Sequence, residues 1–225
     1  MELQVNTLFQ CDGYDRLMSV NEPGNKQAPR FFLGRTAAGN LLRLRHDLPR
    51  DLAKELESLA AREPIPYDLK DPPREQFPIM HALRRHGSVV EDYRGPAYVF
   101  PTPIPRVDGV VKLTPQYASR LHPSLVTLAP QLIHTQPCLA VVEAGRAVSV
   151  CYSARTGPRG AEAGVETAPE YRGRGHALRA TAAWARTVQQ QGLLALYSTT
   201  WENAASLAIA KRLGLRLYGE DWHVR

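Results

Sequence analysis

The sequence predicts a mixed α+β fold, in which a mostly antiparallel central sheet is flanked by helices and preceded by a small α+β unit. Three observations predict it. Alternating apolar runs between residues 139 and 167 form an antiparallel meander, strand–helix units follow up to residue 219, and a hairpin with an amphipathic helix comes before. With 225 residues, 44% of them hydrophobic, the chain can bury one sizeable core.

The N-terminal part begins with a predicted β-hairpin. The runs 31–35 and 41–45 are apolar and extended in character, and the turn between them contains Gly39-Asn40. A helix follows, with Asp47 as its predicted cap and Pro64 as its stop. Its apolar face consists of Leu48, Leu52, Leu56 and Leu59.

Two proline-rich passages then divide the chain. Prolines between residues 64 and 78 predict an irregular connector, and a second passage, 96–105, surrounds a short strand at 97–100. We therefore predict an N-terminal unit over residues 1–95 and a second domain over 96–225.

The middle of the chain leads into the meander. Residues 114–121 and 125–133 predict short helices, and strands at 139–143 and 147–153 are joined by a tight turn at Ala144-Gly145. A further turn at 157–160 leads into the strand that ends at Thr167.

The run Arg172-Gly173-Arg174-Gly175 joins that strand to a helix that stops at Gly192. Glycines allow backbone N–H groups to approach an anion, and a helix start adds free donors and a positive dipole end. The same letters also occur in solvated loops and in disordered nucleic-acid-binding segments. Ordered elements on both flanks favour a pyrophosphate cradle.

A second strand–helix unit completes the pattern. The apolar run 193–197 predicts a strand, and a helix over 203–213 is closed by Gly214. Together the two units give the order strand, helix, strand, helix, strand.

Composition narrows the class of protein. The formal net charge is +6, but the basic residues are dispersed, so nucleic-acid binding is not favoured. No apolar run approaches the roughly 18 residues that span a bilayer, and no leader pattern opens the chain, so a cytoplasmic protein without a membrane partner is expected. The 3 cysteines lack metal or disulfide spacing and are interpreted as buried small hydrophobes. No metal site is predicted.

At Arg172, Gly175 and Ala177 the chain resembles the GNAT superfamily of N-acetyltransferases, whose acyl-CoA site carries the pattern Arg/Gln-x-x-Gly-x-Gly/Ala. Asn203, with Ser206 and Leu213-Gly214-Leu215 after it, matches a second signature of that family at the correct spacing. The resemblance covers roughly residues 96–225. Within the superfamily, the chain is similar to a bacterial branch with mostly unassigned substrates. It implies that the fourth and fifth strands are parallel and splay apart to admit the pantetheine arm.

The resemblance implies acetyl transfer from acetyl-CoA to a primary amine, by direct attack in a ternary complex. Residues implied to hold acetyl-CoA are Val165, Thr167, Arg172, Gly173, Arg174, Gly175, His176, Ala177, Asn203 and Ser206. The backbone N–H groups of Val165 and Thr167 would polarise the thioester carbonyl. Asn203 can also simply cap its helix, and His176 can simply be exposed.

The amine must lose a proton, and Glu166 is the leading candidate for the base; Glu162 and Glu143 are weaker candidates that act through water. Many relatives carry a tyrosine acid seven residues after the asparagine, where this chain has Ala210. Tyr197 and Tyr218 are the substitutes considered, although each also fits a core position.

Two functions stay open at this point. The first is an N-acetyltransferase whose acceptor is a small-molecule amine or a protein N-terminus. The second is a CoA-binding module that has lost transfer and serves as a sensor or an assembly subunit. Residues 1–95 either shape the acceptor side or mediate dimerisation, and a homodimer is compatible with the sequence.

Overall fold

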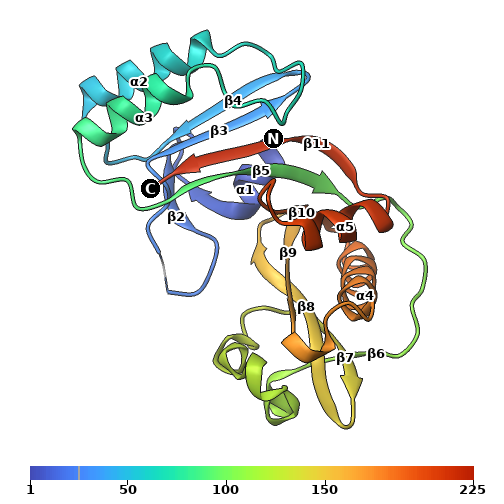
Figure 1. The fold of residues 1–225 in the computed structure, drawn as a ribbon. Coiled ribbons are helices and arrows are strands. Elements are labelled where there is room, and N and C mark those ends of the chain that lie inside the picture. The colour runs from blue at the N-terminus through green and yellow to red at the C-terminus, as the bar shows by residue number, and fades with distance from the viewer. Residues whose placement is uncertain (25) are drawn as a thin grey trace.

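The computed structural model describes residues 1–24 and 26–225. Within them one nine-stranded sheet has the order β4-β3-β11-β5-β10-β9-β8-β7-β6, and β1 and β2 form a separate two-stranded sheet (Figure 1). The strands are β1 (Phe9–Cys11), β2 (Leu17–Val20), β3 (Phe31–Thr36), β4 (Gly39–Leu44), β5 (Asp92–Val99), β6 (Val110–Lys112), β7 (Cys138–Glu143), β8 (Arg146–Thr156), β9 (Gly160–Thr167), β10 (Leu194–Ser198) and β11 (Arg216–Val224). The α-helices are α1 (Glu2–Leu8), α2 (Arg50–Arg62), α3 (Gln76–Arg85), α4 (His176–Gln190) and α5 (Ala204–Arg212), and the 3₁₀ helices are η1 (Pro115–Arg120), η2 (Pro123–Gln131) and η3 (Pro169–Tyr171).

The predicted mixed sheet is confirmed. In the described part of the chain, β9 and β10 form the parallel pair of the large sheet, and its other neighbouring strands are antiparallel. The predicted meander appears as β7, β8 and β9, and the two strand–helix units appear as β9–α4 and β10–α5.

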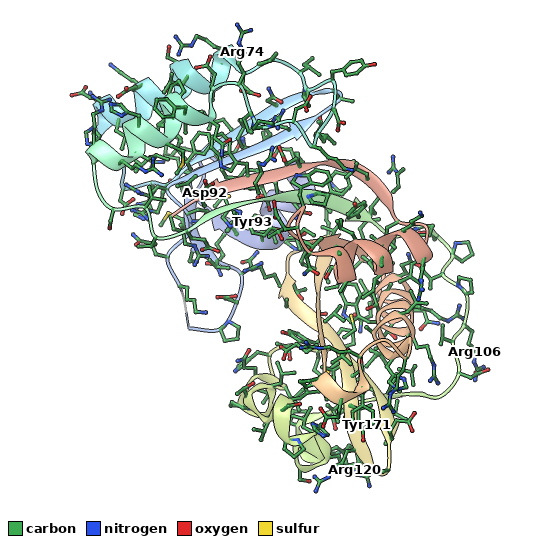
Figure 2. All side chains as sticks on the ribbon, viewed as in Figure 1. Arg74, Asp92, Tyr93, Arg106, Arg120 and Tyr171 are labelled. Atoms are coloured by element: carbon green, nitrogen blue, oxygen red, sulfur yellow. The ribbon has the colours of Figure 1, made fainter. Side chains whose placement is uncertain are left out.

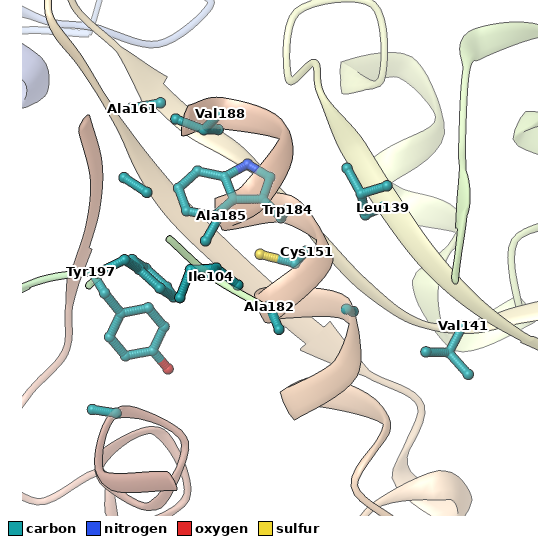
Figure 3. Close-up of a cluster of buried hydrophobic side chains, with 14 residues drawn as sticks. Ile104, Leu139, Val141, Cys151, Ala161, Ala182, Trp184, Ala185, Val188 and Tyr197 are labelled. Carbon is teal, nitrogen blue, oxygen red and sulfur yellow. The ribbon is translucent and has the colours of Figure 1, made fainter. Parts of the chain in front are cut away.

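Helix α4 covers one face of the meander. Trp184, which is fully buried, packs with Phe100 and Val188, and its indole N–H donates to the Ser153 hydroxyl over 3.1 Å (Figure 3). Cys151 lies in the same core, and burial raises the pKa of its thiol. Cys138 is also buried, as predicted, whereas Cys11 is only half-buried.

The N-terminal hairpin is confirmed as β3 and β4, which pair from Phe31 with Leu44 to Thr36 with Gly39. The predicted cap of the next helix is wrong. Helix α2 begins at Arg50 behind Pro49, and the Asp47 carboxylate instead accepts bonds from Arg45 and Gln27. Because Arg45 and Gln27 already bind the Asp47 carboxylate, it does not accept from the first amides of the helix.

The connector is also more ordered than predicted, because helix α3 begins at Gln76. Pro78 is the third residue of that helix, where the missing N–H has no intrahelical partner to lose. Helix α1 and strands β1, β2 and β6 were likewise not predicted, since each is short. The predicted division after residue 95 falls inside β5, which pairs with both β10 and β11, and the two-domain division stays a prediction.

A buried ion network joins the N-terminal part to the C-terminal strand. The Arg35 guanidinium on β3 lies 2.5 Å from Glu220 of β11 and 3.4 Å from Glu63, and all three side chains are buried. The other oxygen of Glu220 accepts the indole N–H of Trp201 over 2.7 Å. Trp201 lies two residues before Asn203, so this network also fixes the loop that opens α5.

Gly95 on β5 provides a test of how tightly that loop is packed. A Cβ at position 95 would lie 1.7 Å from the backbone oxygen of Thr199, so Gly95→Ala forces the two segments apart. We expect a loss of about 3 kcal/mol or more in the free energy of unfolding, measured by urea titration. Gly13→Ala is the control, because no atom lies within 4 Å of its Cβ position and its change is expected to stay within about 0.5 kcal/mol. Equal losses in both variants would contradict the packing argument.

Candidate active site

An uncapped helix start forms the centre of the site. Gly173 and Gly175 have φ angles of 74° and 77°, in the left-handed region, and open space surrounds both of their Cβ positions. Helix α4 begins immediately afterwards, and no side chain caps it. Across the described residues, the N–H groups of residues 173–178 have no backbone acceptor. Six consecutive free donors at a helix start are a suitable arrangement for an anion.

The two arginines of this turn differ in position. Arg172 lines the cleft beside the turn, and its Nε lies 3.4 Å from the Thr167 carbonyl oxygen. Arg174 is turned aside: it donates to the Glu170 carbonyl oxygen over 2.9 Å and stacks over Tyr171, at the end of η3 (Figure 2). Arg172 therefore supplies the fixed positive charge of the cleft, and Arg212 of α5 adds a second that the sequence did not indicate.

The cleft has a volume of about 710 Å³ and lies between the end of β9, the start of α4 and the exposed side of α5. It brings together most of the predicted residues: Val165, Glu166, Thr167, Arg172, Gly173, Gly175, His176, Ala177, Asn203 and Ser206. Arg174, Tyr197 and Tyr218 are not among its lining residues. Ser124 and Leu125 of η2 complete one wall, and no motif in the sequence pointed to them.

The strands β9 and β10 separate within this region. They pair only over Gly160–Glu162 and Leu194–Leu196, and beyond that point β9 continues to Thr167 with one edge open. This is the predicted splay of the parallel pair.

The open edge presents free backbone donors. The Leu194 N–H donates to the Arg159 carbonyl oxygen over 3.0 Å, and the Ala168 N–H donates to Val148 of β8 over 2.9 Å. Because successive strand residues direct their N–H groups to opposite neighbours, the odd-numbered residues of β9 face the side of β10. The N–H groups of Val165 and Thr167 therefore point to the open edge.

The side chains of β9 divide between two faces of the sheet. Ala161, Ala163 and Val165 pack with the core under α4. Because side chains alternate along a strand, Glu162 and Glu166 lie on the opposite face.

The environments of these two glutamates differ. Glu166 lies near the cradle, lines the cleft and accepts a hydrogen bond from the Tyr152 hydroxyl over 3.0 Å. Glu162 lies at the last paired position before the splay, is 3% exposed and accepts a bond from the Ser198 hydroxyl. Its other carboxylate oxygen is buried and, among the residues the structure describes, has no partner.

Burial raises the pKa of Glu162 from 4.5 to about 7, against the lowering effects of Ser198 and of Arg155. The Asp221 carboxylate on β11 raises it further. Tyr93 lies in the same polar cluster, on β5 near the middle of the molecule (Figure 2). Such a shift toward neutral pH is typical of an acid or base that works at that pH.

The tyrosines considered as acids lie apart from each other. Tyr197 is buried in the core; burial raises its pKa to about 12, and Ser206 of the cleft opposes that rise. Its hydroxyl points away from Trp184 (Figure 3). The Tyr218 hydroxyl donates to Gln4 of α1, and burial holds its pKa well above the usual range.

The remaining candidates lie around the helix start. His176 is 7% exposed, and its Nε2 lies 3.8 Å from the carboxylate of Glu143 at the end of β7. Asn203 caps α5 by accepting the N–H of Ser206 over 3.1 Å, which confirms the capping role. Ala210, at the position where many relatives carry a tyrosine, is buried in the core.

Sequence comparison finds one matching family. The model of a family described as GNAT acetyltransferase matches residues 138–221. This region of the chain is therefore similar to GNAT acetyltransferases. The resemblance found in the sequence is thereby confirmed, and β9, the cradle, α4 and α5 all lie inside the matched GNAT region.

Two solved GNAT structures with a TM-score of 0.50 support the GNAT fold. A GCN5-related N-acetyltransferase-like protein from Streptococcus suis shares 17% identity over 88% of this chain and 85% of its own, with a TM-score of 0.50. A GNAT-family acetyltransferase from Colwellia psychrerythraea shares 13% identity over 89% and 82%, also with a TM-score of 0.50. A GNAT-family protein from Novosphingobium aromaticivorans shares 24% identity over 61% of this chain and 66% of its own, with a TM-score of 0.49. No curated protein matches the chain.

Metal ligands and membrane-spanning helices complete the description of the chain. Over residues 1–24 and 26–225, no group of three or more His, Cys, Asp or Glu side chains is arranged to hold a metal ion. None of the helices in the described chain is long and apolar enough to cross a membrane.

Proposed function

We propose that this protein is an N-acyltransferase that moves the acetyl group of acetyl-CoA to a primary amine by direct attack in a ternary complex. One observation carries the proposal: a single cleft joins the uncapped start of α4 to the open edge of β9. Free N–H donors at one end suit a pyrophosphate, and free strand N–H groups at the other suit a carbonyl oxygen.

The residues would share the binding work as follows. The N–H groups of residues 173–178 and the Arg172 guanidinium hold the phosphates, and Asn203 with Ser206 lies along the pantetheine arm. The open-edge N–H of Val165 or Thr167 donates to the thioester oxygen. Acetyl-CoA supplies an activated carbonyl, and no covalent bond to the protein is needed.

We assign the base to Glu162 rather than to Glu166. Glu162 lies where the two strands begin to separate, is buried, and has a pKa near 7 with one carboxylate oxygen free. Glu166 lies four residues nearer the cradle, where Tyr152 already donates to it. Tyr197, whose hydroxyl lies beside Ser206, is the proposed proton source for the departing thiolate.

The test is binding followed by turnover. Acetyl-CoA at about a hundred times its dissociation constant is expected to add about 2.7 kcal/mol to the free energy of unfolding. A panel of primary amines is then expected to release free CoA thiol at a rate that depends on the amine. Absence of any stabilisation by acetyl-CoA or CoA would refute the proposal.

Ala210 supports one alternative, because it removes the tyrosine acid found in many relatives. A CoA-binding module without transfer would be stabilised by acetyl-CoA and would release no thiol with any amine. The same two measurements therefore separate the two functions.

A further inference from the structure

A second cavity lies on the sheet face opposite α4. It has a volume of about 300 Å³ and is bounded by the end of the β1–β2 hairpin, the C-terminal end of β8 and the segment before β7. Its polar lining consists of Gln10, Asn21, Glu22, His134, Arg155 and Thr156, with Ser153 beneath. In Figure 1 the hairpin and the η1–η2 segment lie on the side of β8 and β9 away from α4.

Arg155 connects this cavity to Glu162. It lines the cavity and pairs directly across from Glu162 in the β8–β9 ladder, next to a bulge in β8. Directly opposed residues have Cβ atoms about 4.5–5.5 Å apart and share one face of the sheet. The positive charge of Arg155 lowers the pKa of Glu162, against the effect of burial, which agrees with this proximity.

The Arg155 guanidinium is only weakly paired. Its terminal nitrogen lies 3.6 Å from the Glu22 carboxylate, which is already bound by Lys26 at 2.9 Å. Its Nε is buried and lacks an acceptor among the described atoms. An anionic group in the cavity would replace Glu22 as the partner of the terminal nitrogens of Arg155, and His134 adds a further donor.

We propose that this cavity is the acceptor site and that it takes an amino acid: Arg155 binds the carboxylate while Glu162 removes a proton from the amine. The proposal rests on the acetyltransferase function proposed above. The short distance between the two opposed side chains fits an amine and a carboxylate separated by only a few bonds.

The reaction balances within this arrangement. The ammonium gives one proton to Glu162, the nitrogen lone pair forms a bond to the acetyl carbon, and the carbon–sulfur bond breaks. The thiolate leaves as CoA with a proton from Tyr197, the second proton of the nitrogen restores the Tyr197 hydroxyl, and Glu162 passes its proton to solvent. Acceptor and acetyl-CoA would approach from these two separate cavities and meet where β9 and β10 separate.

The test compares amines that differ only in the carboxylate. Each L-amino acid and its C-terminal amide are supplied with acetyl-CoA, and CoA thiol release gives kcat/KM for both. The kcat/KM for an amino acid is expected to be at least about tenfold higher than that for its amide. Arg155→Gln should lower kcat/KM for acids on the order of a hundredfold, mainly through KM, and bring acids and amides to parity. Arg155→Lys should recover part of the preference.

Arg159→Gln is the matched control, because Arg159 is exposed in the turn that follows β8 and is expected to leave the ratio unchanged. Thermal melting checks that each variant is folded. Turnover of amides or peptides without a preference for acids, or an unchanged ratio in Arg155→Gln, would overturn the acceptor assignment and leave the transferase function standing. Binding of acetyl-CoA with no turnover of any amine would overturn both.

Discussion

Replacing Glu162 with glutamine is expected to lower kcat by about 10²- to 10⁴-fold, which is the usual contribution of a general base. The physical reason is the combination of a free carboxylate oxygen with burial at the point where β9 and β10 part. Glutamine keeps the size and can still accept from Ser198, so the packing is preserved while the proton acceptor is lost.

The pH profile gives an independent readout. Only ionised Glu162 can accept a proton, and its pKa is near 7, so the rate of the natural protein should rise as pH increases through 7. The rise should disappear in Glu162→Gln. Glu166→Gln is the matched control on the same strand face and should retain the profile. A lost profile in Glu166→Gln with a preserved one in Glu162→Gln would transfer the role to Glu166.

The free energy of unfolding should fall as pH rises through this range, whereas the rate should increase. The carboxyl has a pKa of about 7 in the folded state and 4.5 unfolded, so the unfolded chain ionises first as pH rises. Stability is then fully present below pH 4.5 and falls until about pH 7, by on the order of 3 kcal/mol. Glu162→Gln should remove this fall, which urea titration at pH 5 and pH 8 would detect.

The second large effect is expected at the cradle, where Gly175→Glu should abolish the stabilisation by acetyl-CoA. A carboxylate at this position meets the same N–H groups that a phosphate would use and repels the ligand. At a ligand concentration of about a hundred times the natural dissociation constant, the full stabilisation of about 2.7 kcal/mol should be lost.

Gly192→Glu is a close control, because Gly192 follows the other end of α4 with a φ of 78°, against 77° for Gly175, and open space around it. Both variants carry the same left-handed strain of roughly 1–2 kcal/mol. Thermal melting with and without acetyl-CoA separates strain from binding. Retained stabilisation in Gly175→Glu, or equal loss in Gly192→Glu, would contradict the cradle.

The parts of the site that depend on local sequence could be predicted. Positive φ at Gly173 and Gly175, the start of α4 and the cap at Asn203 all follow from residues within a few positions of each other. Helix α3 could not be predicted in the same way, because its first turn contains a proline and resembles a connector.

The sequence favoured Glu166 over Glu162 as the base, and local sequence could not have given the opposite order. Both residues lie on the same face of β9, so alternation cannot separate them. Their difference comes from remote segments: Asp221 lies on β11 and Tyr93 on β5. Those pairings close over long stretches of chain, and no local pattern specifies them.

Strand β11 lies between β3 and β5 in the sheet, so this part of the sheet can form only after the end of the chain has been synthesised. Roughly 180 residues separate β3 from its partner β11. At translation rates of about 5–20 residues per second, the edge of β3 therefore stays unpaired for about 10–40 s before β11 is synthesised. During that interval Trp222 and Val224, which pack with Phe31 and Leu33 in the folded protein, have not yet been synthesised. A nascent chain in this state exposes an apolar strand edge, so production of the protein should depend on chaperone supply as well as on final stability.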